Sequence, residues 1–121
     1  MKKTLSKTKL ILFDVDGTIL DSHAAIIGHH LKIASMLGLR KPSEKEIAAK
    51  LCMPWRHLIP ALWPQADATE FEKKYRKENK SEQIYLFPGA IDAIKLLGKS
   101  HLLGIVTGRN SESVKENFSN F

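Results

Sequence analysis

The chain has 121 residues, the usual size of one domain, which excludes a large multidomain machine. Hydrophobic residues make up 43% and charged residues 26%, proportions that exclude a low-complexity or wholly disordered chain. The net charge of +6 makes an anionic partner worth testing, and a single cysteine excludes a scaffold built on disulfides.

The distribution of the basic residues argues against a nucleic-acid site. One group lies near the N-terminus and comprises Lys2, Lys3, Lys7 and Lys9. The other group lies within residues 73–80 and is interleaved with glutamates, which is typical of a solvated helix with paired charges. We therefore expect no nucleic-acid partner, and nucleic-acid binding is kept only as a third functional hypothesis.

Membrane insertion and export are not expected either. No apolar run approaches the roughly 18 residues that span a bilayer. The basic start is followed only by the short apolar stretch Leu10–Phe13 before Asp14, whereas a signal peptide needs an apolar core of about 7–15 residues. We expect a cytoplasmic protein without a membrane partner, and we expect Cys52 to be a small buried apolar residue.

The first predicted element is a strand over Leu10–Phe13, because this run is continuously apolar and ends at a turn with Gly17. Helical spacing of apolar residues follows in Ala24–Leu37. Ser43 is expected to cap a helix that runs through Leu51, and a charged helix is predicted from Ala68 to about Ile84. Between the last two helices, prolines are expected to break the chain into short turns: Pro54, Pro60 and Pro64.

The chain then returns to an alternation of helix and strand. Apolar spacing predicts a helix over Ala90–Leu97, and a second buried strand is predicted over Leu102–Thr107. A final helix is expected after this strand, capped by Ser111 or Asn110. Its apolar side is formed by Val114, Phe118 and Phe121.

These elements predict an α/β fold with an insertion. Two strands joined through a helix form a right-handed crossover unit with parallel strands, and such a unit needs only about 30 residues. The residues beyond this requirement lie within 23–86 and are predicted to form an all-helical cap. The rest, residues 1–22 and 87–121, is predicted to be an incomplete Rossmann-like parallel core.

Polar residues follow both predicted strands, at the sheet edge where open α/β folds bind ligands. Asp14 and Asp16 are two residues apart, so both can face the same side, and a hard cation such as Mg²⁺ would relieve their repulsion. One carboxylate can attack phosphorus while the other moves a proton. The Thr107 hydroxyl and the Gly108 amide form a possible oxyanion clamp.

The segment Phe13–Ser22 closely resembles the first signature motif of the haloacid dehalogenase superfamily. More narrowly, it is similar to the phosphatase branch with a helical cap, of the phosphoglycolate phosphatase and β-phosphoglucomutase type. The segment Ile105–Arg109 resembles the second motif, and Leu86–Ala90 is similar to the return from cap to core. Weaker similarity is seen in the cap, at Leu51–Trp55 and Tyr75–Arg76.

The resemblance implies a role for each matching position. Asp14 would be the nucleophile and a magnesium ligand. Asp16 would be the general acid and base, with its backbone carbonyl on the metal. Thr107 and Gly108 would bind the transferring phosphoryl group. The implied substrate is a small phosphorylated metabolite, and the phosphoryl group would pass to water or, in a phosphomutase, to a sugar.

Other polar and aromatic residues are not expected to take part in the chemistry. Arg109 and Arg56 are expected to be solvated, although either could touch a substrate. The pair His29–His30 is not expected to bind a metal, because no further ligand is evident at a suitable spacing. Trp55 and Trp63 are expected to pack within the cap.

The family pattern continues with a lysine motif and an acidic motif that find no match before Phe121. We therefore expect a truncated, weakly active or inactive phosphatase. A fragment of a longer enzyme, a degenerate gene product and one half of a split protein all fit this expectation. A second hypothesis is a non-catalytic interaction protein, in which an oligomer or a partner covers an exposed strand edge at Leu10–Phe13.

Overall fold

The computed structural model describes residues 7–78 and 84–118. The chain divides into two compact units: the core unit, Met1–Ser22 with Ile84–Phe121, and the helical insertion, His23–Gln83. The core unit combines parallel strands with helices, which confirms the predicted α/β class. The chain returns from the insertion to the core unit at Ile84, whereas the sequence placed this boundary at residue 87.

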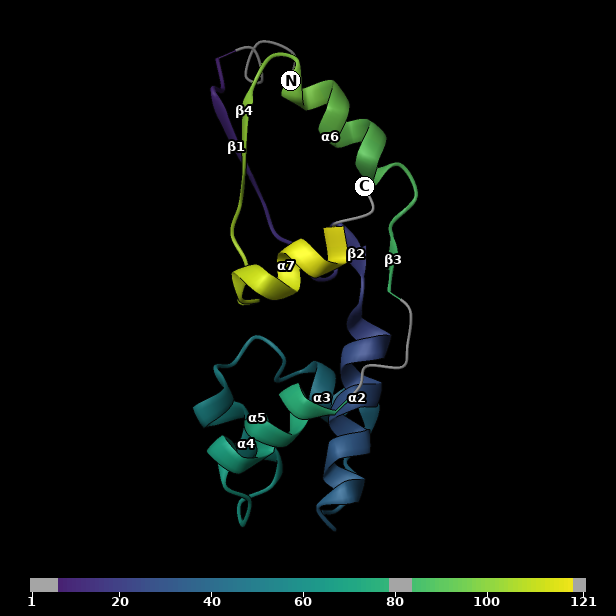
Figure 1. Cartoon of the computed structure of the whole chain (residues 1–121), viewed down its shortest axis with the longest axis vertical. Coiled ribbons are helices and arrows are strands. Elements are labelled where there is room, and N and C mark those ends of the chain that lie inside the picture. The colour runs from purple at the N-terminus through teal and green to yellow at the C-terminus, as the bar shows by residue number, and fades with distance from the viewer. Residues whose placement is uncertain (1–6, 79–83, 119–121) are drawn as a thin grey trace. The chain divides into compact units, whose positions relative to one another are not determined.

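The core unit is built on two parallel strands (Figure 1). Strand β1 (Leu10–Phe13) pairs with β4 (Leu102–Ile105) in the register Leu10 to Leu102, and helix α6 (Ala90–Gly98) precedes β4 as the crossover predicts. β4 ends at Ile105 rather than at Thr107. One further hydrogen bond, from the Val106 amide to the Phe13 carbonyl (2.9 Å), aligns the two chains where they leave the sheet.

One face of this sheet is apolar and exposed. Leu10, Leu12 and Leu102 are 52%, 58% and 73% exposed, and in the described part of the chain β1 pairs with β4 alone. The strands also approach closely, since a Cβ added at Gly104 would lie 2.9 Å from Leu12. The predicted exposed apolar edge at β1 is therefore confirmed. The prediction that the two strands are buried was wrong, because every residue of β1 and β4 is exposed or half-buried.

The other side of the sheet borders an open apolar groove of about 540 Å³. Its lining comes from β1, β4, α6 and helix α7 (Ser111–Phe118), and from Ile19 in the loop after β1. The Asn110 side chain caps α7 by accepting a hydrogen bond from the Ser113 amide (2.8 Å). Of the two capping residues that the sequence allowed, Asn110 and Ser111, the structure shows Asn110. Phe121, which was predicted on the apolar side of this helix, lies outside the described residues.

A second, antiparallel strand pair was not predicted. Strand β2 (Leu20–Asp21) pairs with β3 (Tyr85–Leu86), and the Phe87 amide adds a bond to the Ile19 carbonyl (2.9 Å). Strands of two residues are too short to show an alternating pattern in the sequence. The pair joins the two chain segments of the core unit.

The helical insertion has its own hydrophobic core. It contains α2 (His23–Met36), α3 (Glu44–Ala48), α4 (Trp55–Leu62) and α5 (Ala68–Lys77). Aromatic rings of Trp63 and Phe71 stack with their centroids 4.9 Å apart. The other buried members of this core are Ile33, Ala34, Ile47, Leu58, Ile59, Leu62 and Tyr75.

Helix α4 corrects the prediction that prolines break this region into turns. Pro54 stands at the N-cap and Pro64 lies past the end of the helix, where neither interrupts a helical hydrogen bond. Pro60 lies inside the helix and is exposed. Burial of the face that carries Leu58, Ile59 and Leu62 outweighs the missing Pro60 donor.

The predicted capping box of α3 is confirmed. The Ser43 hydroxyl accepts from the Glu46 amide (3.1 Å), and the Glu46 carboxylate accepts from the Ser43 amide (2.9 Å). Hydrogen bonding from Arg40 holds the pKa of Glu46 below its usual value. The helix ends at Ala48 rather than at Leu51, so the box stabilises one short helix.

Helix α5 carries the paired charges that the sequence predicts. Ion pairs join Arg76 to Glu72 (2.7 Å) and Lys74 to Glu78 (3.1 Å), each spanning one turn. The helix ends at Lys77, short of the predicted Ile84. Residues 79–83 of that prediction lie outside the described residues.

Cys52 is exposed, so the prediction that it is buried was wrong. It lies in the turn between α3 and α4, where its neighbours Met53 and Pro54 are exposed too. Trp55 and Trp63 pack in the insertion as predicted. None of the helices described is both long and apolar enough to cross a membrane.

Candidate active site

The loop after β1 is wound around one backbone carbonyl. The Val15 carbonyl accepts hydrogen bonds from three successive amides, those of Thr18, Ile19 and Leu20, at 3.2, 2.9 and 3.0 Å. Gly17 has a φ of 75°, which an L side chain rarely adopts, so the predicted sharp turn depends on this glycine. The Val15 side chain is fully buried, which fixes the loop to the core unit.

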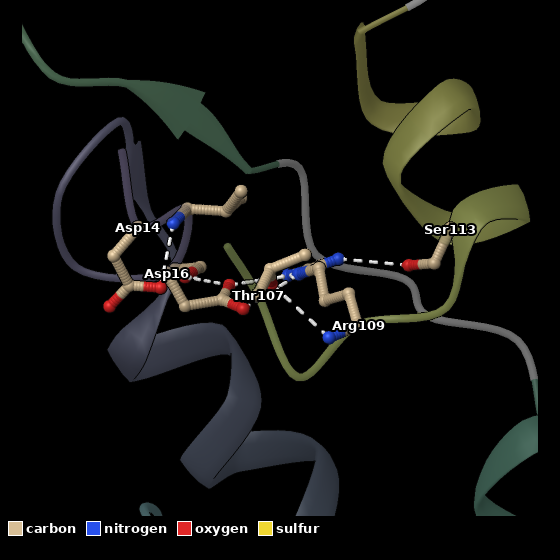
Figure 2. A network of polar contacts seen from close by, with 7 residues as sticks. Asp14, Asp16, Thr107, Arg109 and Ser113 are labelled. Carbon is tan, nitrogen blue, oxygen red and sulfur yellow. Dashed lines mark hydrogen bonds and ion pairs between the residues drawn. The ribbon is translucent and has the colours of Figure 1, made fainter. Parts of the chain in front are cut away.

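This buried valine separates the two predicted catalytic carboxylates. Asp14 is exposed and its Oδ1 accepts from the Val15 amide at 2.8 Å. Asp16 is half-buried. Figure 2 shows the two side chains next to each other at the carboxyl end of β1. The structure therefore brings both carboxylates to the predicted sheet edge.

Asp16 is held by a residue from the other strand end (Figure 2). Arg109 donates from Nε to Oδ2 at 2.8 Å and to Oδ1 at 3.0 Å, and from Nη2 to Oδ1 at 2.7 Å. The side chains of Arg109 and Asp16 are only 11% and 24% exposed. The hydroxyl of buried Ser22 donates to the same carboxylate.

The position of Arg109 corrects the expectation of a solvated arginine. Its Nη1 also donates to Ser113 Oγ at 3.1 Å, so the guanidinium bridges the β1 loop and α7. The signal in the sequence was a cation a few residues past the end of one strand, together with two carboxylates past the end of its parallel partner. Ser22 was missed as well, although it lies within the motif Phe13–Ser22.

The predicted phosphoryl clamp lies in the same network. Thr107 is half-buried, and its Oγ1 accepts from the Arg109 amide at 3.2 Å. Gly108 is exposed, and a Cβ placed on it would have no heavy atom within 4 Å apart from those of its two neighbours in the chain. The Cβ side of Gly108 is thus open, at the position that follows Thr107 in the chain.

The oxygen donors at this edge fit a magnesium ion, which takes few protein carboxylates and keeps several waters. Asp14 would offer its exposed carboxylate. The Asp16 carboxylate is already engaged by Arg109 and Ser22, and the resemblance assigns the backbone carbonyl of Asp16 to the metal. Within residues 7–78 and 84–118 no three His, Cys, Asp or Glu side chains are placed to hold a metal ion.

The remaining candidates lie in the insertion. His29 and His30 are buried, and a ring nitrogen of each lies within hydrogen-bond distance of a backbone carbonyl: 2.9 Å to that of Tyr75 and 2.7 Å to that of Ile26. Arg56 is exposed, as expected, and its Nε donates to His57 at 3.2 Å. These contacts give the histidines a packing role.

The sequence matches the haloacid dehalogenase-like hydrolase family over residues 11–121. This match covers most of the chain, and the chain belongs to this family of hydrolases. The resemblance drawn from the two strand-end motifs is therefore confirmed. A search of curated proteins found no match.

Solved structures of similar fold agree with this assignment. A haloacid dehalogenase-like hydrolase from Streptococcus pneumoniae is 26% identical, with a TM-score of 0.82 over 93% of this chain and 55% of that one. A proposed hydrolase of the same kind from Bacteroides fragilis (21%, TM-score 0.83, 94% and 58%) shares the fold. So does a proposed phosphoglycolate phosphatase from Lactobacillus plantarum (24%, TM-score 0.76, 94% and 56%). The chain thus spans little more than half the length of these proteins.

Proposed function

We propose that the site belongs to a magnesium-dependent phosphomonoester hydrolase that acts through an aspartyl-phosphate. The observation that carries this proposal is the meeting of Asp14 and Asp16 with Thr107 and Arg109 at the carboxyl ends of β1 and β4. Membership of a hydrolase family supports it, and the proposed phosphoglycolate phosphatase of similar fold supports a phosphomonoester as the substrate.

The reaction proceeds in two steps. A carboxylate oxygen of Asp14 attacks phosphorus, the ester P–O bond breaks, and Asp16 gives a proton to the departing alcohol oxygen. Water then attacks the aspartyl-phosphate, its proton passes to Asp16, and inorganic phosphate leaves as the Asp14 carboxylate is restored. In a phosphomutase, a sugar hydroxyl would take the place of this water.

The residues around the two carboxylates have supporting roles. The Thr107 hydroxyl and the Gly108 amide bind phosphoryl oxygens as charge develops on them. A bound magnesium ion supplies charge neutralisation at the phosphoryl group. We infer that these 121 residues by themselves are weakly active or inactive, because they span little more than half the length of the hydrolases of similar fold.

We expect Thr107→Ala to lower kcat by about 10²–10³-fold, because one donor to the developing oxyanion is lost. Thr107→Ser keeps the hydroxyl and is expected to retain most of the activity. Turnover of a phosphomonoester is the measurement, in the most active form of the protein that is obtained. An unchanged kcat/KM in Thr107→Ala would contradict the clamp.

A non-catalytic interaction protein is the second candidate function, and the apolar face of the β1–β4 sheet favours it. We expect copies of the chain to associate through this face. Leu102→Lys should raise the dissociation constant at least about tenfold, because a 73% exposed leucine would otherwise become buried. Met36→Lys, at an exposed apolar position in the insertion, is the control. A wild-type monomer in sedimentation equilibrium would contradict this function.

A further inference from the structure

The pair between Arg109 and Asp16 differs from the other arginine ion pairs of the described residues. The Arg40–Glu46 and Arg76–Glu72 pairs have arginine side chains that are 49% and 55% exposed, and each joins residues close in sequence. Arg109 is 11% exposed and joins the two strand ends. Its guanidinium forms a two-pronged contact with both oxygens of Asp16. This contact therefore involves the carboxylate that we propose transfers the proton.

The contact leaves Asp16 in an arrangement that cannot perform its proposed step. Both carboxylate oxygens accept hydrogen bonds from Arg109, and Oδ1 also accepts from Ser22. To reach the oxygen of a bound ester, the carboxylate has to leave the guanidinium. After such a release, the Ser22 hydroxyl would still donate a hydrogen bond to the Asp16 carboxylate.

A phosphate-class anion can replace the Asp16 carboxylate as the hydrogen-bond acceptor of the Arg109 guanidinium. A planar guanidinium binds a phosphate in the same two-pronged manner as a carboxylate. The Arg109 amide donates to Thr107 Oγ1, so the arginine is tied through its backbone to the residue that we propose binds the phosphoryl group. The open space at Gly108 adjoins the same turn.

We propose that Arg109 is a positioning residue that exchanges partners. It holds Asp16 while the site is free of an anion. It turns to a phosphate-class anion that binds beside Thr107 and Gly108, and this exchange releases the Asp16 carboxylate. The inference rests on the proposed function, and it adds a residue that couples binding of the anion to the readiness of Asp16.

The test is a titration of the full chain with inorganic phosphate, without magnesium, followed by NMR signals of backbone amides and of arginine Nε–H groups. If Asp16 and phosphate compete for Arg109, Asp16→Asn should tighten phosphate binding about five- to tenfold. Arg109→Gln should weaken it by a similar factor. In an Arg109→Gln background, Asp16→Asn should then bring little or no gain.

Controls separate this exchange from simpler effects. Asp92→Asn removes one charge from an exposed position on α6 and should leave phosphate affinity unchanged. Arg109→Lys keeps the positive charge but cannot form the two-pronged contact. It replaces Arg109→Gln in the test if Arg109→Gln does not fold. In the wild type, the Arg109 Nε–H signal should move on phosphate binding toward its position in Asp16→Asn.

Two outcomes would overturn the exchange in different ways. If Asp16→Asn raises the phosphate affinity equally in the wild-type and Arg109→Gln backgrounds, the gain comes only from removing the repulsion between Asp16 and phosphate. That result would overturn the exchange but not the phosphate site. No phosphate binding in the wild type or in Asp16→Asn would remove both the exchange and the phosphate site. The nucleophile is tested separately through turnover, so failure of the exchange and failure of the proposed function are distinguishable.

Discussion

Replacing Asp14 with asparagine is expected to lower phosphomonoester turnover by about 10⁴-fold or more, as the loss of a nucleophile does in other hydrolases that act through covalent intermediates. Asp14 is the exposed carboxylate at the end of β1, and an amide in its place cannot attack phosphorus. The variant should fold normally, because this exposed side chain is bonded to the amide of its own neighbour, Val15. Steady-state turnover with and without magnesium is the measurement.

Asp21→Asn is the matched control for this experiment. Asp21 is also exposed and belongs to the same unit, but it lies on β2, past the loop that carries the site. Its replacement should leave turnover within about twofold of the wild type. Equal turnover in Asp14→Asn and the wild type would rule out Asp14 as the nucleophile.

Replacing Trp63 with alanine is expected to lower the free energy of unfolding by about 3–5 kcal/mol. The Trp63 side chain is fully buried, stacks on Phe71, and donates from its indole nitrogen to the Arg40 carbonyl at 2.9 Å. The substitution leaves a cavity in the core of the insertion and also removes the indole donor from the Arg40 carbonyl. Urea unfolding followed by circular dichroism measures the change.

Two further substitutions calibrate this effect. Trp63→Phe keeps an aromatic ring and loses the indole donor, so we expect a smaller cost than that of Trp63→Ala. Met53→Ala shortens a side chain that is 39% exposed and should change the free energy of unfolding by less than about 0.5 kcal/mol. A loss below about 1 kcal/mol in Trp63→Ala would contradict the packed core.

The elements that the sequence predicted best are those with an unmistakable pattern. The apolar runs at β1 and β4 predicted parallel strands, because continuous apolar runs without alternation are typical of such strands. The capping box at Ser43 likewise marked the start of α3. Such signals are local, so one sequence is enough to read them.

The sequence did not predict features that depend on tertiary contacts. Helix α4 forms despite Pro60 because its apolar side is buried against the other helices of the insertion. The pair β2–β3 joins segments that are far apart in the chain. Arg109 was expected to be solvated, because the positions of a cation and two carboxylates after the strand ends do not by themselves show that Arg109 and Asp16 are in contact.

The two units bury very different amounts of apolar surface. The packed cluster of the described residues lies in the helical insertion, whereas the fully or nearly buried apolar residues of the core unit are Val15, Ile19 and Leu20. Local stability follows burial, so backbone amides of the insertion should exchange with deuterium more slowly than those of β1 and β4. The carboxylates that we propose as catalytic are therefore carried by the unit that opens more readily, and a bound anion would slow its opening by mass action.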